Sequence, residues 1–86
     1  MSLVNLNRYG SKASDRVRVS LSEKDALTLP PRTRQIRVIS GQAWISLGHE
    51  DVVIGPQETL YLHQKRPGAV VTSLGKQRLE FDLIEE

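Results

Sequence analysis

Short runs of alternating apolar and polar residues, separated by glycine or proline, constrain the fold of this chain more than any other feature. In RVRVSL (16–21), Val17, Val19 and Leu21 fall on one face, while arginine and serine fall on the other. A period of two residues is typical of a β-strand with one buried face. We expect further strands in six later segments: QIRVIS (35–40), AWISL (43–47), EDVVI (50–54), ETLYLH (58–63), AVVTSL (69–74) and RLEFDLI (78–84).

The segment SEKDALTLPP (22–31) is compatible with two local structures. Ser22 and Asp25 have the spacing of a helical capping box. Pro30 and Pro31, however, follow too closely to leave room for a proper helix. We therefore predict a turn at 22–25 that closes a hairpin, followed by a short strand at 26–29.

Seven or eight short strands at close spacing, with no substantial helix, indicate an all-β protein: a sandwich or a small antiparallel barrel. A chain of 86 residues is sufficient for one domain at most. We assign residues 15–86 to this domain and residues 1–14, which show no periodicity, to an N-terminal arm or irregular lead-in.

Composition narrows the possible functions. The chain has no cysteine, which excludes disulfides, zinc-thiolate sites and thiol nucleophiles. No apolar run approaches the ~20 residues needed to span a bilayer, and the N-terminus lacks the apolar core of a signal peptide. We therefore expect a cytoplasmic protein without a membrane partner.

Charge is unevenly distributed along the chain. Residues 1–37 hold eight of the twelve lysines and arginines but only three of the ten acids. Such a basic segment can attract nucleic acid through its field, and the candidates for that role are Arg8, Lys12, Arg16 and Arg18. Because these residues are scattered, with only Tyr9 among them as a stacking aromatic, a solvated tail or a subunit contact is the favoured interpretation.

One strand-turn-strand motif carries a family resemblance. Gly41-Gln42-Ala43-Trp44-Ile45-Ser46 fits the pattern G-x-x-W-[IV]-[ST], and Pro56-Gln57-Glu58 stands where a Pro-Gly-Asp turn is usual. With the later turn at Pro67-Gly68, residues 17–84 resemble the cupin superfamily, and more closely a small bacterial cupin-like family of unknown function. The resemblance implies a cupin-like barrel (a double-stranded β-helix) and a tendency to form homodimers or higher homo-oligomers.

The resemblance also implies positions for metal ligands, and this chain does not fill them. A cupin glutamate would fall on Arg34, the paired histidines on Thr28 and Pro30 or on Leu27 and Leu29, and the last histidine on Gly68. Divalent metals need imidazole or carboxylate ligands, and a guanidinium would repel them. We therefore expect a metal-free cupin-like domain without a cofactor. A rebuilt metal site around His49 and His63, with Glu50, Asp51 or Glu58, is the alternative.

Four residues are candidates for binding a ligand or partner: Trp44, Tyr61, Arg34 and His63. Alternation places Trp44 and Tyr61 opposite the aliphatic face of their strands, so each is covered by another segment, exposed as an interface, or, if the faces are reversed, part of the core. Arg34 either binds an anionic ligand or points to solvent, and solvent is favoured.

The sequence favours a non-catalytic module that binds a protein partner or small ligand and leaves enzymatic activity open. The alternatives are a degenerate metal-binding enzyme that uses His49 and His63, and a nucleic-acid-binding regulator.

Overall fold

Eight short strands make up the part of the chain that the structure, a computed structural model, describes: residues 15–62 and 68–85. They are β1 (Asp15–Leu21), β2 (Ala26–Thr28), β3 (Thr33–Ser40), β4 (Ala43–Ser46), β5 (Asp51–Ile54), β6 (Thr59–Tyr61), β7 (Val70–Ser73) and β8 (Leu79–Glu85). The all-β prediction is confirmed for these residues. They include no helix that could cross a bilayer.

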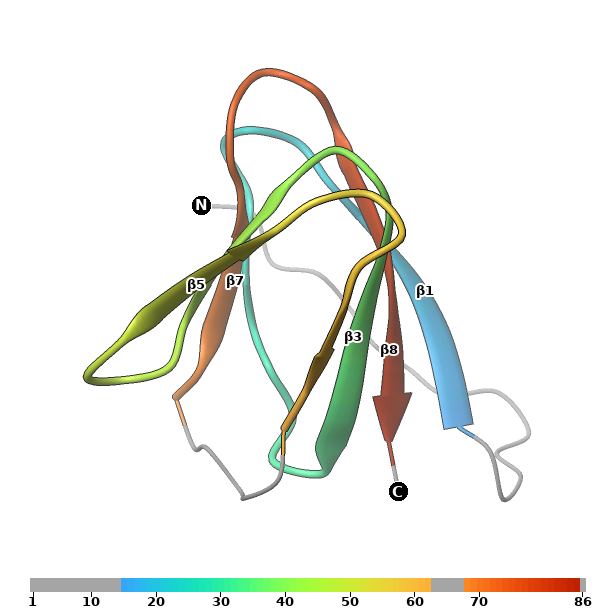
Figure 1. Cartoon of the computed structure of the whole chain (residues 1–86), viewed down its shortest axis with the longest axis vertical. Helices are drawn as coiled ribbons and strands as arrows, with labels where there is room; N and C mark the ends of the chain where they lie inside the picture. The colour runs from blue at the N-terminus through green and yellow to red at the C-terminus, as the bar shows by residue number, and fades with distance from the viewer. Residues whose placement is uncertain (1–14, 63–67, 86) are drawn as a thin grey trace.

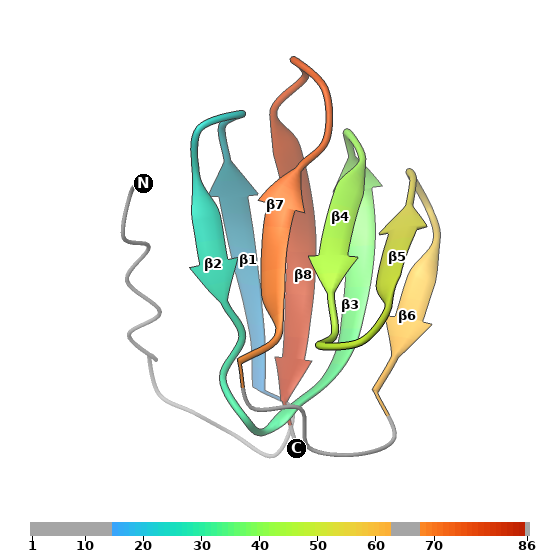
Figure 2. The same cartoon turned by 90° about the vertical axis from the view of Figure 1, so that its left-hand side faces the viewer.

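The strands form two four-stranded sheets packed face to face (Figure 1). Sheet I has the order β1-β8-β3-β6 and sheet II the order β2-β7-β4-β5, and all neighbouring strands are antiparallel. Figure 2 shows sheet II lying in front of sheet I. The two sheets are not closed into a barrel, so the described residues form an antiparallel sandwich.

The pairing follows from one long two-stranded ribbon. Strand β1 pairs with β8, β2 with β7, β3 with β6 and β4 with β5, so the chain runs out along the ribbon and returns beside itself. The tip of the ribbon is the turn at 47–50, where the Leu47 amide donates to the Glu50 carbonyl at 2.9 Å. Winding the ribbon puts the pairs β1–β8 and β3–β6 in sheet I and the pairs β2–β7 and β4–β5 in sheet II. Pairing of β8 with β3 joins the first two, and pairing of β7 with β4 joins the other two. This is the arrangement of a double-sheet jelly roll.

The hairpin predicted at 22–25 is wrong, although the turn itself forms. The Asp25 amide donates to the Ser22 carbonyl at 3.0 Å, and the Ser22 amide and hydroxyl donate to Asp25 Oδ2 at 2.9 and 3.0 Å. The turn carries the chain from β1 in sheet I to β2 in sheet II. Both strands direct their apolar side chains into the same core, from opposite sides.

The core lies between the sheets and consists of the inward residues of each alternating strand. The predicted apolar face of residues 17–21 is confirmed, because Val19 and Leu21 are buried and Val17 packs against them. Phe81 of β8 is the largest fully buried side chain. The remaining buried apolar residues are Leu27, Leu29, Ile36, Val38, Ala43, Ile45, Leu47, Ile54, Leu62, Ala69, Val71, Leu79 and Leu83.

Candidate anion-binding site

The outer face of sheet I gathers arginines from strands that are far apart in the sequence. Alternation directs Arg16 and Arg18 of β1 outward because Val17 and Val19 point into the core. The register then sets Arg18 opposite Asp82 of β8, and Asp82 opposite Arg37 of β3. One carboxylate is thus placed between two guanidinium groups across three neighbouring strands.

Asp82 is buried at the centre of this face and binds Arg18 with both carboxylate oxygens. Arg18 Nε donates to Oδ1 at 2.5 Å and Nη2 donates to Oδ2 at 3.3 Å. The hydrogen bond to Asp82, and then the attraction of its charge, raise the pKa of Arg18 above its ordinary value. Because that pKa is raised, loss of the Arg18 proton removes this interaction only in strong base, as the pH rises through the raised value.

Arg37 is directed toward Gln57 rather than toward Asp82. Its Nη2 donates to Gln57 Oε1 at 3.5 Å, a long contact. Gln57 has a positive φ of 71°, a conformation that favours glycine. It is held there because its amide donates to the Val38 carbonyl at 2.9 Å while the Val38 amide donates to Glu58 at 3.0 Å.

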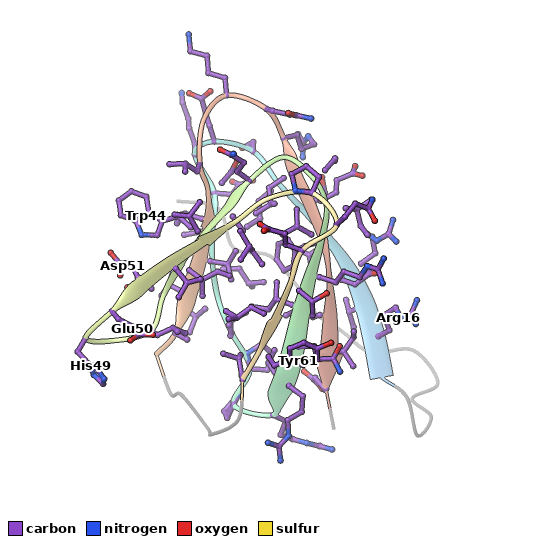
Figure 3. The ribbon with its side chains drawn as sticks, viewed as in Figure 1. Arg16, Trp44, His49, Glu50, Asp51 and Tyr61 are labelled. Carbon is purple, nitrogen blue, oxygen red and sulfur yellow. The ribbon has the colours of Figure 1, made fainter. Side chains whose placement is uncertain are left out.

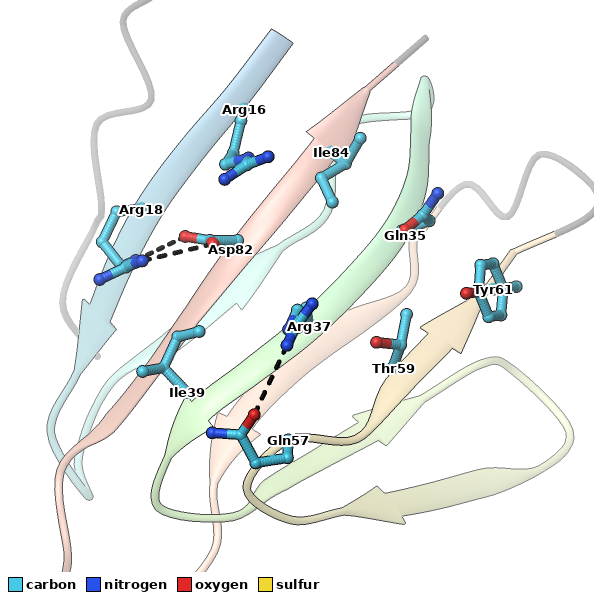
Figure 4. Close-up of a pocket in the computed structure, with 10 residues that line it drawn as sticks. All are labelled: Arg16, Arg18, Gln35, Arg37, Ile39, Gln57, Thr59, Tyr61, Asp82 and Ile84. Atoms are coloured by element: carbon cyan, nitrogen blue, oxygen red, sulfur yellow. Dashed lines mark hydrogen bonds and ion pairs between the residues drawn. The ribbon is translucent and has the colours of Figure 1, made fainter. Parts of the chain in front are cut away.

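These groups line a hollow of about 450 Å³, which we call the arginine hollow (Figure 4). Its ten lining residues come from β1, β3, β6, β8 and the turn before β6: Arg16, Arg18, Gln35, Arg37, Ile39, Gln57, Thr59, Tyr61, Asp82 and Ile84. Tyr61 is 58% exposed and lies at the opposite edge of the sheet from Arg16. The volume is within the range of small-molecule pockets, ~300–1,000 Å³.

The electrostatics of the arginine hollow favour an anion. Three guanidinium groups face one carboxylate, and Arg18 already binds that carboxylate. The Arg16 side chain has no hydrogen bond or ion pair with a described residue. Arginine presents a planar set of donors that matches carboxylate and phosphate oxygens. The lining contains no histidine or cysteine, and its polar remainder is amide, hydroxyl and phenol.

The structure separates the two predicted aromatic sites. Trp44 is 43% exposed on the outer face of sheet II, whereas Tyr61 lies on sheet I. The interpretation of Trp44 as core is therefore wrong, and no described segment covers it. Arg34 lies at the irregularity of β3 between Thr33 and Gln35, where it is half-buried and engaged with other groups, and it does not line the arginine hollow.

The candidates for metal or nucleic-acid binding are partly outside the described residues. Arg8, Lys12 and His63 all lie there, so the proposed pairing of His63 with His49 stays a prediction. His49 is exposed at the tip of the 47–50 turn (Figure 3). Within residues 15–62 and 68–85, no group of three or more histidine, aspartate or glutamate residues could hold a metal ion. Leu27 and Leu29, which occupy one pair of the implied ligand positions, are buried in the core.

Of the ten residues that line the hollow, only Arg16, Arg18 and Tyr61 were candidates from the sequence, and the polar residues Arg37, Asp82 and Gln57 were not among them. Alternation indicates that Arg37 points outward, but it does not indicate that β8 separates Arg37 from Arg18. The signal for Gln57 was its place in the Pro56-Gln57-Glu58 turn, where the resemblance implies glycine.

Comparison with known proteins adds no relative. No family model matches the sequence, and neither a curated protein nor a solved structure shows significant similarity to it. Functional inference for this chain therefore depends on its own residues.

Proposed function

We propose that this protein is a non-catalytic binding module whose ligand is an anion held in the arginine hollow. The observation that carries the proposal is the convergence of Arg16, Arg18 and Arg37 on one hollow that contains a single carboxylate. Arg16 and Arg37 are the groups that contact the ligand. Arg18 is held by Asp82 and contributes mainly by neutralising it.

The ligand chemistry is a phosphate or carboxylate group, which has two possible sources. One is a small free anion, for which the hollow has room. The other is the backbone of single-stranded nucleic acid, because Tyr61 offers an exposed ring on the same face as the arginines. The small anion is our choice, since Tyr61 is the only aromatic residue among those that line the hollow.

Isothermal titration of the intact chain tests the proposal with three probes: inorganic phosphate, citrate and a single-stranded oligonucleotide. We expect phosphate or citrate to bind, and Arg16→Gln and Arg37→Gln each to weaken binding by about five- to tenfold. Lys24→Gln is the matched control. It removes one positive charge from an exposed turn outside the hollow, and it should leave affinity unchanged.

Two results would overturn the proposal. One is the absence of binding by all three probes at millimolar concentration. The other is an equal loss in the Lys24 and arginine variants, which would indicate net charge alone. Selective oligonucleotide binding that falls steeply between about 50 and 200 mM salt would reject the small anion and identify nucleic acid as the ligand.

We also propose a cupin-like origin for the domain. Support comes from the ribbon topology and from the turn at Pro56-Gln57-Glu58. Gln57 has positive φ where the resemblance implies glycine, and Glu58, in the place of the aspartate, accepts the Gly55 amide with its Oε1 at 2.6 Å. A metal-free state, a homodimer or higher oligomer, and a cytoplasmic, bacterial setting belong to the same proposal. Sedimentation velocity and metal analysis of the purified chain test the first two.

A further inference from the structure

The outer face of sheet II has the opposite chemical character to that of sheet I. The register aligns two rows across its four strands, Ala26-Thr72-Trp44-Val53 and Thr28-Val70-Ser46-Asp51. Neither row contains lysine or arginine, and Asp51 is the one charged residue in them. Trp44 and Val53 are 43% and 52% exposed, so this face presents apolar surface beside a single carboxylate.

A second hollow, of about 210 Å³, lies in this face and is lined by Trp44, Ser46, Asp51, Val70 and Thr72. We call it the tryptophan hollow. Figure 3 shows Trp44 and Asp51 on the same side of the molecule, away from Arg16 and Tyr61. The Thr72 hydroxyl donates to the Trp44 carbonyl at 3.4 Å. The hollow is smaller than the ~300 Å³ typical of free-ligand pockets, so it suits one inserted side chain.

We propose that the tryptophan hollow binds an arginine side chain of an extended partner peptide. An indole ring is the best aromatic surface for a cation, and the Asp51 carboxylate at the wall of the hollow supplies the counter-charge. The two outer rows of sheet II contain no lysine or arginine, so no cation in these rows competes with the partner's arginine for Asp51. The exposed Val53, next to Trp44 in its row, provides apolar surface for a neighbouring residue of the peptide.

The geometry favours arginine over other cations. A guanidinium group is planar, so it can stack on one indole face while it donates two hydrogen bonds to one carboxylate. A methylated ammonium group cannot donate in this way and is usually enclosed by several aromatic rings. This face offers one ring. The site lies on the opposite sheet from the arginine hollow and does not depend on the proposed function.

The test is a fluorescence titration, because Trp44 is the only tryptophan in the chain and its emission reports on the site. The probes are the peptide acetyl-Gly-Val-Arg-Val-Gly-amide and its citrulline counterpart, which is neutral and nearly isosteric. We expect the arginine peptide to bind about fivefold or more tightly than the citrulline peptide. Asp51→Asn should remove that preference.

Glu50→Gln is the matched control, because Glu50 is an exposed acid next to Asp51 that does not line the hollow. It should keep the preference for arginine. Trp44→Leu, followed by titration calorimetry, should lose binding while thermal unfolding shows that the fold is retained. Equal binding of the two peptides, or equal losses in the Asp51 and Glu50 variants, would overturn the proposal. So would Trp44-dependent self-association in sedimentation velocity, which would identify a second copy as the occupant.

Discussion

The carboxylate of Asp82 is buried on the outer face of sheet I, where β1 and β3 place Arg18 and Arg37 on either side of it. A buried carboxylate is tolerated only where its charge is compensated and its oxygens accept hydrogen bonds. Asp82 meets both conditions through Arg18. The same contact neutralises one of the arginines of the hollow, so Asp82 affects stability and ligand affinity in opposite directions.

We predict that Asp82→Asn lowers the free energy of unfolding by about 1 kcal/mol, because a charge-assisted hydrogen bond is lost at a pair whose arginine is largely exposed. The variant should at the same time bind phosphate or citrate more tightly, since Arg18 is released to the ligand. Urea denaturation and titration calorimetry measure the two effects.

Glu80→Gln is the control for this prediction, because Glu80 lies two residues away on the same strand outside the hollow and acts on Arg18 by charge alone, as the smallest of the causes that raise the pKa of Arg18. It should change stability by less than about 0.5 kcal/mol. If Asp82→Asn weakened anion binding, Asp82 would be acting by orienting Arg18 for the ligand rather than by competing with it.

At the residue scale, only part of the candidate site could be predicted, namely Arg16, Arg18 and Tyr61 among the ten lining residues. Alternation puts Arg16, Arg18, Trp44 and Tyr61 opposite the aliphatic residues of their strands, and all four side chains are exposed in the structure. Alternation indicates which face a side chain occupies but not which strand lies next to its own. For that reason neither the partnership of Arg18 with Asp82 nor the separation of Trp44 from Tyr61 could be predicted.

At the element scale, the link between β3 and β4 depends on Gly41. This glycine has a φ of +82°, and a Cβ built there would lie 2.6 Å from the Arg78 carbonyl oxygen and 2.9 Å from the Leu79 Cα. Both neighbours are backbone atoms next to or within the central strand β8, so they cannot move away without disturbing the sheet. The turn of the strand-turn-strand motif at Gly41 is present in the structure, and it crosses between sheets in close contact with β8.

We predict that Gly41→Ala lowers the free energy of unfolding by about 3 kcal/mol, because the left-handed backbone and the clash of the added Cβ both raise the free energy of the folded state. Gly48→Ala is a matched control: its φ is +101°, and nothing lies within 4 Å of the added Cβ. It should cost only about 1 kcal/mol. Chemical denaturation of the two variants measures the difference, and similar losses would show that the clash at Gly41 is relieved by a local shift.

The position of the strands could be predicted far better than their pairing. Each expected segment contains a strand because glycine and proline turns define the ends of the alternating runs. The predicted hairpin at 22–25 is wrong because the same short turn can join two amphipathic strands in two ways. The strands can pair within one sheet, or they can face each other across the core, as β1 and β2 do. The choice between these arrangements depends on strands that are distant in the sequence. Here β8, which carries the inward residues Phe81 and Leu83, pairs with β1 and β3.

At the scale of the whole molecule, the wound ribbon explains why two surfaces of different chemistry coexist on so short a chain. Within the described residues, each sheet buries one face in the common core and leaves the other uncovered, so the cationic outer face of sheet I and the aromatic face of sheet II, with its single carboxylate, can differ in chemistry. A jelly-roll order could not be predicted from periodicity, since it depends on pairings between opposite ends of the chain such as β1 with β8.

The pairing of β1 with β8 has a mechanical consequence. Asp15 is opposite Glu85, so the outer ends of the first and last strands lie side by side at one end of an antiparallel ladder. Because ladder hydrogen bonds run across the strands, a pull applied at these two residues loads the rungs one after another. Force spectroscopy with handles at 15 and 85 should therefore record unzipping at low force, whereas handles at 21 and 85, which load all rungs of the same pair in shear, should meet much higher resistance.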